Sequence, residues 1–207
     1  MTAVTRSADG VVTGNTFDKY NARNPVARAL MRGFERNLDD LFFSTEPHSV
    51  LDVGCGEGVL TQRWASTLAP ARVVGIDLDD PLLAAEWARR PAPNLTYIAQ
   101  RAEQLPFAAG EFDLVCAIEV LEHVPDPERT LAEMARCAAR HVLVSVPREP
   151  LWRAVNMARG AYWRQLGNTP GHVNHFSKPG IVALCARHGE VIETRSPFPW
   201  TMVLVRV

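Results

Sequence analysis

Apolar positions along this chain follow two alternating spacings, and together they predict the order of its strands and helices. Short, nearly continuous apolar runs are typical of strands that are buried on both faces of a parallel sheet. Between these runs, apolar residues recur at the spacing of amphipathic helices. The predicted strands are 49–53, 72–76, 95–99, 112–117, 141–146, 190–195 and 201–207, and the predicted helices among them are about 57–68, 80–89, 127–139 and 178–188.

This β-α-β order predicts an α/β fold, with a seven-stranded doubly wound, Rossmann-like sheet in a single domain. The 207 residues suffice for one domain with a sizeable core. Ahead of the first strand, helical spacing from Val26 to Phe42 predicts one or two helices that begin near Pro25. Residues 1–15, which include Thr, Ser, Gly, Asp and Asn, are expected to form a flexible tail, so the folded domain spans 16–207.

The strand–helix rhythm is interrupted after Pro147 by a long segment, residues 148–176. Once the sheet and its helices are assigned, this insertion and the N-terminal helices within 16–45 are the parts left over. We therefore expect these two segments to form the side of the site that receives an acceptor molecule.

Composition narrows the class of protein. Apolar residues make up 47% and charged residues 22%, which is typical of a globular protein, and the net charge is −1. Nucleic acid is a disfavoured partner, because phosphate binding needs a clustered basic surface. The four cysteines are scattered without a Cys-x-x-Cys pair, and no stretch reaches the length of a membrane span. These features predict a cytoplasmic protein with reduced thiols.

The strongest chemical signal is a buried strand that runs into a glycine turn, Val50–Gly58, followed about twenty residues later by a strand that ends on Asp77. Glycines allow a ligand to approach the backbone closely, and an acid at the end of the second strand can accept hydrogen bonds from two ribose hydroxyls. Position 59 is valine, so the dinucleotide pattern G-x-G-x-x-G is absent. The turn therefore predicts a nucleoside-like ligand.

The residues Asp-Val-Gly-Cys-Gly-Glu-Gly, 52–58, resemble motif I of the class I S-adenosylmethionine-dependent methyltransferases. Residues 101–107 similarly resemble the loop that these enzymes fold over adenine, although family members often carry Asp where this chain has Arg101. The resemblance covers about 49–146 and implies the class I methyltransferase fold with S-adenosylmethionine as cofactor. The implied cofactor-binding residues are Asp52, Gly54, Cys55, Gly56, Asp77, Leu78, Ala102, Glu103 and Ile118.

A second group of polar residues follows the fourth predicted strand. Glu119, Glu122 and His123 are spaced so that a helical turn would place them on one face. One interpretation is a structural Glu-His turn that Pro125 ends. The other is a divalent metal site, because carboxylates and a neutral imidazole suit Mg²⁺, Mn²⁺ or Zn²⁺.

This Glu-x-x-Glu-His pattern resembles the ubiquinone-biosynthesis O-methyltransferases and the Hen-type small-RNA 2′-O-methyltransferases, both metal-dependent. The resemblance implies Glu119, Glu122 and His123 as metal ligands, with a fourth ligand from the segment 171–179. His172 is the first choice for that ligand and His175 the second, and either of them could be the catalytic base. The bound metal would lower the pKa of an acceptor hydroxyl.

The insertion offers a candidate acceptor wall. Plotted as one helix, its apolar residues share a face, and Arg159 falls inside that face. The insertion is then either a lid packed on the core or a wall for a hydrophobic acceptor that carries a negative group, with a membrane surface as a further partner. The residues of this face are Leu151, Trp152, Val155, Ala158, Tyr162, Trp163 and Leu166, of which Trp152, Tyr162 and Trp163 are expected to line or cover the pocket.

Three functions compete at this point. The leading hypothesis is an S-adenosylmethionine-dependent methyltransferase of a small hydrophobic acceptor, most simply an O-methyltransferase assisted by a metal. The alternative is a metal-independent C- or N-methyltransferase of the same superfamily. The second alternative is a non-catalytic nucleoside-binding protein that has kept the fold and lost the chemistry. The sequence leaves the oligomeric state open.

Overall fold

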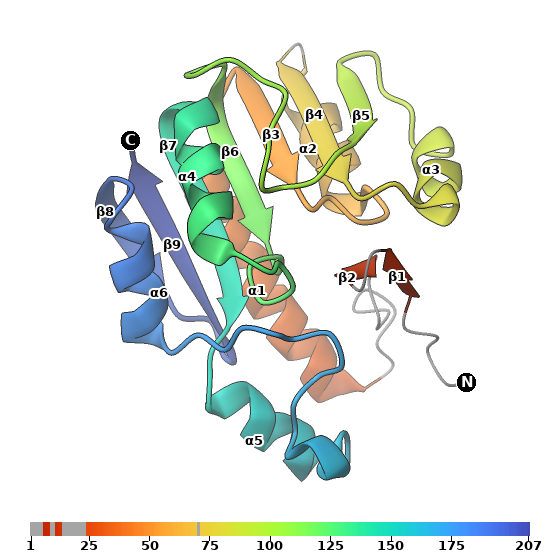
Figure 1. Cartoon of the computed structure of the whole chain (residues 1–207), viewed down its shortest axis with the longest axis vertical. Helices are drawn as coiled ribbons and strands as arrows, with labels where there is room; N and C mark the ends of the chain where they lie inside the picture. The colour runs from red at the N-terminus through yellow and green to blue at the C-terminus, as the bar shows by residue number, and fades with distance from the viewer. Residues whose placement is uncertain (1–5, 9–10, 14–23, 70) are drawn as a thin grey trace.

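The computed structural model describes residues 6–8, 11–13, 24–69 and 71–207 of the chain. Its centre is a seven-stranded sheet with the order β5-β4-β3-β6-β7-β9-β8 (Figure 1). The first five strands in this order are parallel, and β9 runs antiparallel to both of its neighbours. The strands are β3 Ser49–Val53, β4 Arg72–Asp77, β5 Leu95–Ala99, β6 Phe112–Ile118, β7 Ala138–Pro147, β8 Glu190–Arg195 and β9 Trp200–Arg206.

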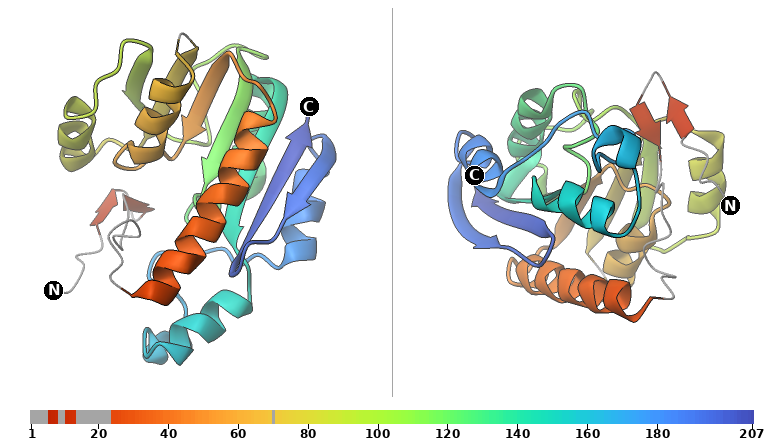
Figure 2. Two further views of the ribbon diagram at one scale, coloured as in Figure 1. Left: turned by 180° about the vertical axis from the view of Figure 1, so that it is seen from behind. Right: turned by 90° about the horizontal axis from the view of Figure 1, so that it is seen from below.

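Helices cover both faces of the sheet, because alternate side chains of its central strands point to opposite faces and both sets are apolar (Figure 2). Val50 packs with Phe34 and Trp64 in one core, whereas Leu51 packs with Met134 and Ile181 in the other. The helices are α1 Pro25–Phe43, α2 Val59–Thr67, α3 Pro81–Ala88, α4 Pro127–Cys137 and α6 Lys178–Cys185. The predicted doubly wound α/β fold is confirmed.

Several helices begin at a capping residue followed directly by proline. Asn24 precedes Pro25 and accepts a 2.8 Å hydrogen bond from the backbone N–H of Val26, and Asp80 caps α3 in the same way. Proline tolerates the first helical position because that N–H has no partner inside the helix. The predicted start near Pro25 is confirmed, and the described residues from Asn24 to β3 contain one helix.

The predicted tail lies largely outside the described residues. Within it, β1 Arg6–Ala8 and β2 Val11–Thr13 pair as antiparallel strands. This pairing was not expected from the sequence, and the flexibility of residues 1–15 stays a prediction. Over the described part of the chain, no helix combines the length and the apolar character that a membrane crossing requires.

The insertion does not form the single long helix on which its apolar face was plotted. Helix α5, Leu151–Ala158, ends before Gly160, and a short 3-10 turn follows at Trp163–Gln165. Gly160, Tyr162 and Leu166 all have left-handed backbone conformations, which break helical geometry. As a result Trp163 and Leu166 are 60% and 66% exposed instead of continuing the face of α5. Helix α5 lies beyond the carboxyl ends of the parallel strands (Figure 1).

Candidate active site

A cleft of about 260 Å³ opens at the carboxyl ends of β3, β4 and β6. Ligands bind at this edge of open α/β sheets because the chain order reverses there and leaves a crevice. Helix α1 and the insertion close the far side of the cleft. All nine residues predicted to bind the cofactor line it: Asp52, Gly54, Cys55, Gly56, Asp77, Leu78, Ala102, Glu103 and Ile118.

The floor of the cleft is the glycine turn after β3. Gly54, Gly56 and Gly58 have φ angles of 73°, 54° and 78°, which are left-handed values that favour glycine. The backbone N–H groups of Gly54 and Cys55 donate to the carbonyl oxygen of Ile76 at 2.8 and 2.9 Å. These bonds fasten the turn to the end of β4, so the turn and Asp77 are held as one unit.

Asp77 lies at the end of β4, as predicted. Its Oδ2 accepts a 2.7 Å hydrogen bond from the N–H of Gly56, and its Oδ1 accepts one of 2.8 Å from the N–H of Leu78. Burial raises the pKa of this carboxyl, and the two N–H donors act in the opposite direction. The two donors fix the carboxylate at the rim of the cleft, where it can accept the hydroxyls of a sugar.

Two aromatic residues that no sequence motif marks support the same turn from behind. Trp87 donates through Nε1 to the carbonyl oxygen of Gly56 at 2.8 Å, and the Tyr97 hydroxyl donates to that of Gly58 at 3.1 Å. Their rings are stacked, with centroids 5.3 Å apart and planes 4° apart. Polar ring atoms on rigid aromatic side chains fix the turn with little loss of side-chain entropy.

Asp52 lies underneath the turn and is buried. Its Oδ2 accepts a 2.6 Å hydrogen bond from the Thr61 hydroxyl. Burial raises the pKa of this carboxyl to about 7.

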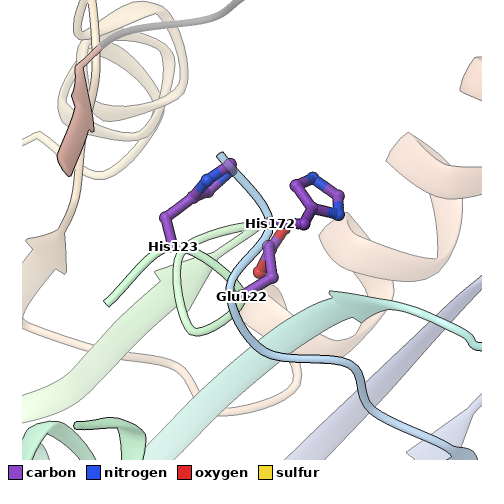
Figure 3. A group of neighbouring side chains, drawn as sticks. All are labelled: Glu122, His123 and His172. Carbon is purple, nitrogen blue, oxygen red and sulfur yellow. The ribbon is translucent and has the colours of Figure 1, made fainter. Parts of the chain in front are cut away.

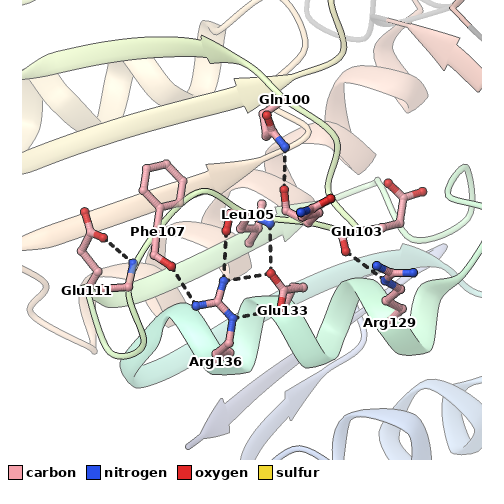
Figure 4. Close-up of polar contacts among 10 residues, drawn as sticks. Gln100, Glu103, Leu105, Phe107, Glu111, Arg129, Glu133 and Arg136 are labelled. Atoms are coloured by element: carbon pink, nitrogen blue, oxygen red, sulfur yellow. Dashed lines mark hydrogen bonds and ion pairs between the residues drawn. The ribbon is translucent and has the colours of Figure 1, made fainter.

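The loop between β5 and β6 forms the wall predicted to face adenine, and three side chains of α4 hold it (Figure 4). Arg136 donates to the carbonyl oxygens of Leu105 and Phe107 at 3.0 and 2.8 Å, while Glu133 accepts from the N–H of Leu105 at 3.0 Å. Arg129 donates to the carbonyl oxygen of Glu103 at 3.1 Å. The hydrogen bonds from Arg136 lower the pKa of Glu133 to about 2.

The turn after β6 separates the residues that were predicted together as metal ligands. Glu119 has a left-handed φ of 61°, and both of its oxygens serve neighbours: Oε1 accepts from the Ser145 hydroxyl at 3.0 Å and Oε2 from the Trp200 indole at 2.7 Å. Among the described residues, ligand atoms that could share an ion are gathered by Glu122, His123 and His172, all within 4.8 Å of one another (Figure 3).

These three side chains fit a divalent ion. Donors that share an ion at about 2.0–2.2 Å lie about 3–4 Å apart, so small side-chain movements would close them on it. His123 donates through Nδ1 to the carbonyl oxygen of Gly171 at 2.9 Å, which fixes the tautomer whose Nε2 carries the lone pair. The rings of His123 and His172 lie 4.8 Å apart at 83°. Glu122 and His172 are 2% and 8% exposed.

His175, the other predicted catalytic base, does not line the cleft. Its imidazole is exposed, and Nε2 lies 2.9 Å from Oδ1 of Asn168. Residues 172–175, ahead of α6, belong to no helix or strand, and among them His172 lines the cleft whereas His175 does not. The geometry therefore favours His172 over His175 at the site.

The acceptor end of the cleft has aromatic walls. Trp152 and Tyr162 line it, as predicted, and so do Phe34 and Trp200, which the sequence did not single out. The ring of Trp200 lies 4.8 Å from Phe34 and 5.6 Å from Trp152. The prediction that Trp163 lines the pocket is wrong, because the break in the insertion turns it to solvent.

One cationic side chain of the insertion, Arg159, also lines this end of the cleft. It follows the last residue of α5 directly, and it lines the cleft together with Trp152 and Val155 of that helix. A guanidinium beside aromatic rings can hold a negatively charged group of an apolar molecule. The acceptor end is therefore apolar on most sides and positively charged on one.

The strand order, with its antiparallel β9, and the cleft at the glycine turn define a class I methyltransferase fold. Comparison with known proteins agrees. Residues 51–144 match the family described as "Methyltransferase domain", so this chain carries a methyltransferase domain over that segment.

Relatives and solved structures share this class. The ubiquinone biosynthesis O-methyltransferase of Methylococcus capsulatus is 44% identical over 91 residues, which cover 42% of this chain and 38% of that protein. The protein of the same name from Bordetella avium is 32% identical over 157 residues, or 72% of this chain and 64% of that protein. The magnesium protoporphyrin IX methyltransferase from Synechocystis PCC 6803, solved with bound SAH, has a TM-score of 0.63 at 20% identity and covers 90% of this chain and 89% of its own.

The alignments to these two ubiquinone biosynthesis O-methyltransferases span less than two thirds of the relatives' own lengths. The solved structure supports the fold alone, because it is only 20% identical to this chain. Similarity to these proteins therefore does not by itself identify the acceptor of this chain.

Proposed function

We propose that this protein transfers the methyl group of S-adenosylmethionine to an oxygen of a small, hydrophobic acceptor. The proposal is carried by one observation: a single cleft joins the glycine turn and Asp77 at one end to aromatic walls and the Glu122-His123-His172 cluster at the other. The two ends suit two ligands that meet in the middle, as a transfer reaction requires.

Asp77 would accept the hydrogen bonds of the two ribose hydroxyls, and the glycine turn would let the nucleoside approach the backbone. The wall at Ala102 and Glu103 would lie against adenine. The sulfonium of S-adenosylmethionine supplies an electrophilic methyl group. The protein's own contribution is to hold that group in line with the acceptor and to exclude water with aromatic rings.

A divalent cation held by Glu122, His123 and His172 would lower the pKa of an acceptor hydroxyl. Mg²⁺ and Mn²⁺ suit the carboxylate, and Zn²⁺ suits the two imidazoles. Glu119 would act through Trp200, whose indole it holds, and not as a ligand. His172 could instead be the catalytic base that accepts the proton of the acceptor hydroxyl. It cannot be a metal ligand and the base at the same time.

The acceptor we propose carries an apolar, ring-sized body and a negative group. Phe34, Trp152, Tyr162 and Trp200 would bury the body, and Arg159 would pair with the charge. The names of the relatives, which are O-methyltransferases, favour oxygen as the methylated atom. A metal-independent C- or N-methyltransferase is the competing function, and in it the Glu-His turn would be structural.

Calorimetric titration with S-adenosylhomocysteine tests the cofactor end. Asp77→Ala removes a charged acceptor of two hydrogen bonds, so the affinity should fall by at least about tenfold. Asp113→Ala is a control that removes a carboxylate of β6 whose hydrogen bonds go to His48 and Ser49, away from the cleft. An unchanged affinity in Asp77→Ala would contradict the placement of the ribose.

Chelation separates the two chemistries. With a panel of hydroxylated aromatic acids as acceptors, EDTA should abolish methyl transfer and leave the affinity for S-adenosylhomocysteine unchanged, because Asp77 and the glycine turn bind the nucleoside without metal. Full turnover in EDTA would instead favour the metal-independent function.

A further inference from the structure

The turn that carries Glu122 and His123 is bound to a distant segment, residues 171–174, by a dense set of hydrogen bonds. The N–H groups of Val173 and Asn174 both donate to the carbonyl oxygen of Glu122, at 2.8 and 3.1 Å. In return, His123 donates through Nδ1 to the carbonyl oxygen of Gly171. Three bonds thus join the two segments through their backbones and one imidazole.

The side chain of Asn174 adds two more bonds. Its Nδ2 donates to the carbonyl oxygen of Leu121 at 3.0 Å and to that of Val124 at 2.7 Å. The turn is not helical, so its buried carbonyls need donors from elsewhere in the chain. An Asn amide supplies two N–H donors from one short side chain, which no hydroxyl or carboxylate can do.

His172 lies between two anchors of this segment. On one side, Asn174 ties the segment to the turn. On the other, the carbonyl oxygen of Thr169 accepts from the N–H of His172 at 3.1 Å, and its hydroxyl accepts from Trp152 and Asn156 of α5 at 2.9 and 3.1 Å. The position of His172 beside Glu122 and His123 therefore depends on both attachments.

We propose that Asn174 is a positioning residue: it clamps the segment 171–174 onto the turn after β6 and thereby brings His172 to Glu122 and His123. Its consequence for metal binding rests on the metal-assisted function proposed above. The clamp itself can be measured without metal. Asn174 contacts neither cofactor nor acceptor site, because it does not line the cleft.

Asn174→Leu removes both donors and keeps a side chain of similar size, and Asn174→Asp replaces the donors with a carboxylate that faces two carbonyl oxygens. Titration with Mn²⁺ alone should show an affinity about 10- to 100-fold weaker in both variants, the usual loss when a residue that orients a metal ligand is changed. The affinity for S-adenosylhomocysteine should stay within about twofold of the wild type, since the glycine turn is untouched.

Val173→Asp is the charge-matched control. Its side chain is 62% exposed, and the substitution adds one negative charge at the neighbouring position while keeping the backbone N–H donor to Glu122. Its Mn²⁺ affinity should equal or exceed that of the wild type. If it falls as far as that of Asn174→Leu, any change in this segment weakens the site, and the specific role of the Asn174 amide is overturned.

Hydrogen exchange reads the clamp directly. In Asn174→Leu the backbone amides of residues 173 and 174 should exchange at least about tenfold faster. The reason is that the two hydrogen bonds from the Asn174 side chain, which hold the segment on the turn, are lost. Unchanged exchange overturns the proposal, whatever the metal result. Should Asn174→Leu also lose S-adenosylhomocysteine binding, the damage is global. Asn174→Ala, which leaves room for water at the carbonyls, then decides by the same exchange measurement.

Glu122→Gln separates this proposal from the function on which it rests. If the wild type and Glu122→Gln bind Mn²⁺ equally, or neither binds it, the metal-assisted function fails. Faster exchange at residues 173 and 174 in the Asn174 variants would still support the clamp in that case, and unchanged exchange would overturn it.

Discussion

The two ends of the cleft are built in different ways. The cofactor end consists of short stretches that each lie directly after a strand, and backbone N–H groups hold its key carboxylate, Asp77. The acceptor end is assembled from α1, the turn after β6, the insertion and the start of β9, which lie far apart in the chain. The cofactor end is thus specified locally, while the acceptor end exists only once the sheet has brought distant segments together.

This difference suggests which end tolerates change. A turn whose backbone must be left-handed at three glycines cannot accept side chains there. Walls made of side chains on separate elements can be replaced one at a time, which suits a protein fold that serves many acceptors. Substitutions at the two ends should therefore differ in size and in kind.

The largest effect is expected at Gly54. A Cβ at this position would overlap the side chain of Val120, and a left-handed backbone costs a non-glycine residue about 1–2 kcal/mol. Because strain and overlap act on the same turn, Gly54→Ala should weaken binding of S-adenosylhomocysteine by about a hundredfold, measured by calorimetry.

Gly33→Ala is the matched control. Gly33 lies inside α1, and nothing is close to where its Cβ would be placed. This substitution should leave the affinity unchanged and stabilise the helix by up to about 1 kcal/mol. Equal affinities for the two alanine variants would show that the turn is more adaptable than its geometry implies.

The same contrast explains how much the sequence could predict. The seven strands were predicted because each is an apolar run in the sequence. The nine residues expected to bind the cofactor line one cleft because each lies near or just after the end of a strand. Trp87 and Tyr97 were missed because their contacts with Gly56 and Gly58 join residues about 30–40 positions apart, and no local rule marks them.

The acceptor end was predicted less well for a physical reason. Helical spacing continues past Ala158, but Gly160 and the left-handed Tyr162 end the helix there, so Trp163 turns outward. Glu119 has the spacing of a metal ligand, yet the fold gives its carboxylate to Ser145 and Trp200. Spacing fixes direction only within a regular element, and neither the turn nor the second half of the insertion is one.

The buried carboxyl of Asp52, beneath the glycine turn, should make the stability of the protein depend on pH. The pKa of Asp52 is raised to about 7 in the folded protein, so the folded state binds more protons than the unfolded state from about pH 4 to pH 7. The contribution of Asp52 to stability should therefore fall as pH rises through this window. Relative to the wild type, Asp52→Asn should gain more than about 1 kcal/mol in unfolding free energy between pH 4 and pH 7, measured by denaturant titration.

The control for this titration is Asp39→Asn, at a half-buried carboxyl of α1 that pairs with Arg63. The difference between this variant and the wild type should change much less with pH, since an ion pair near the surface contributes little. A pH-independent difference for Asp52→Asn would mean that the carboxyl is ionised in the folded protein throughout the window.

At the acceptor end, two tryptophans of the same insertion should respond differently. Trp152 lines the cleft, whereas Trp163 is exposed. With a hydroxylated aromatic acid that the enzyme methylates, Trp152→Ala should raise the Michaelis constant for the acceptor about tenfold and leave the affinity for S-adenosylhomocysteine unchanged. Trp163→Ala should change neither quantity. A loss of cofactor affinity in Trp152→Ala would show that the two ends are coupled.

The smallest effect is expected in the loop between β5 and β6, which side chains of α4 hold in place. Arg136 reaches two backbone carbonyls and Glu133 at once, and a lysine cannot make these contacts together because it carries one compact charge. Arg136→Lys should weaken binding of S-adenosylhomocysteine by about two- to fivefold, since the loop keeps its contacts through Glu133 and Arg129. Arg72→Lys, at an exposed ion pair with Glu111 near the end of the same loop, should have no measurable effect. If both variants bind equally well, α4 does not set the shape of the adenine wall, and the cofactor end depends on the glycine turn and Asp77 alone.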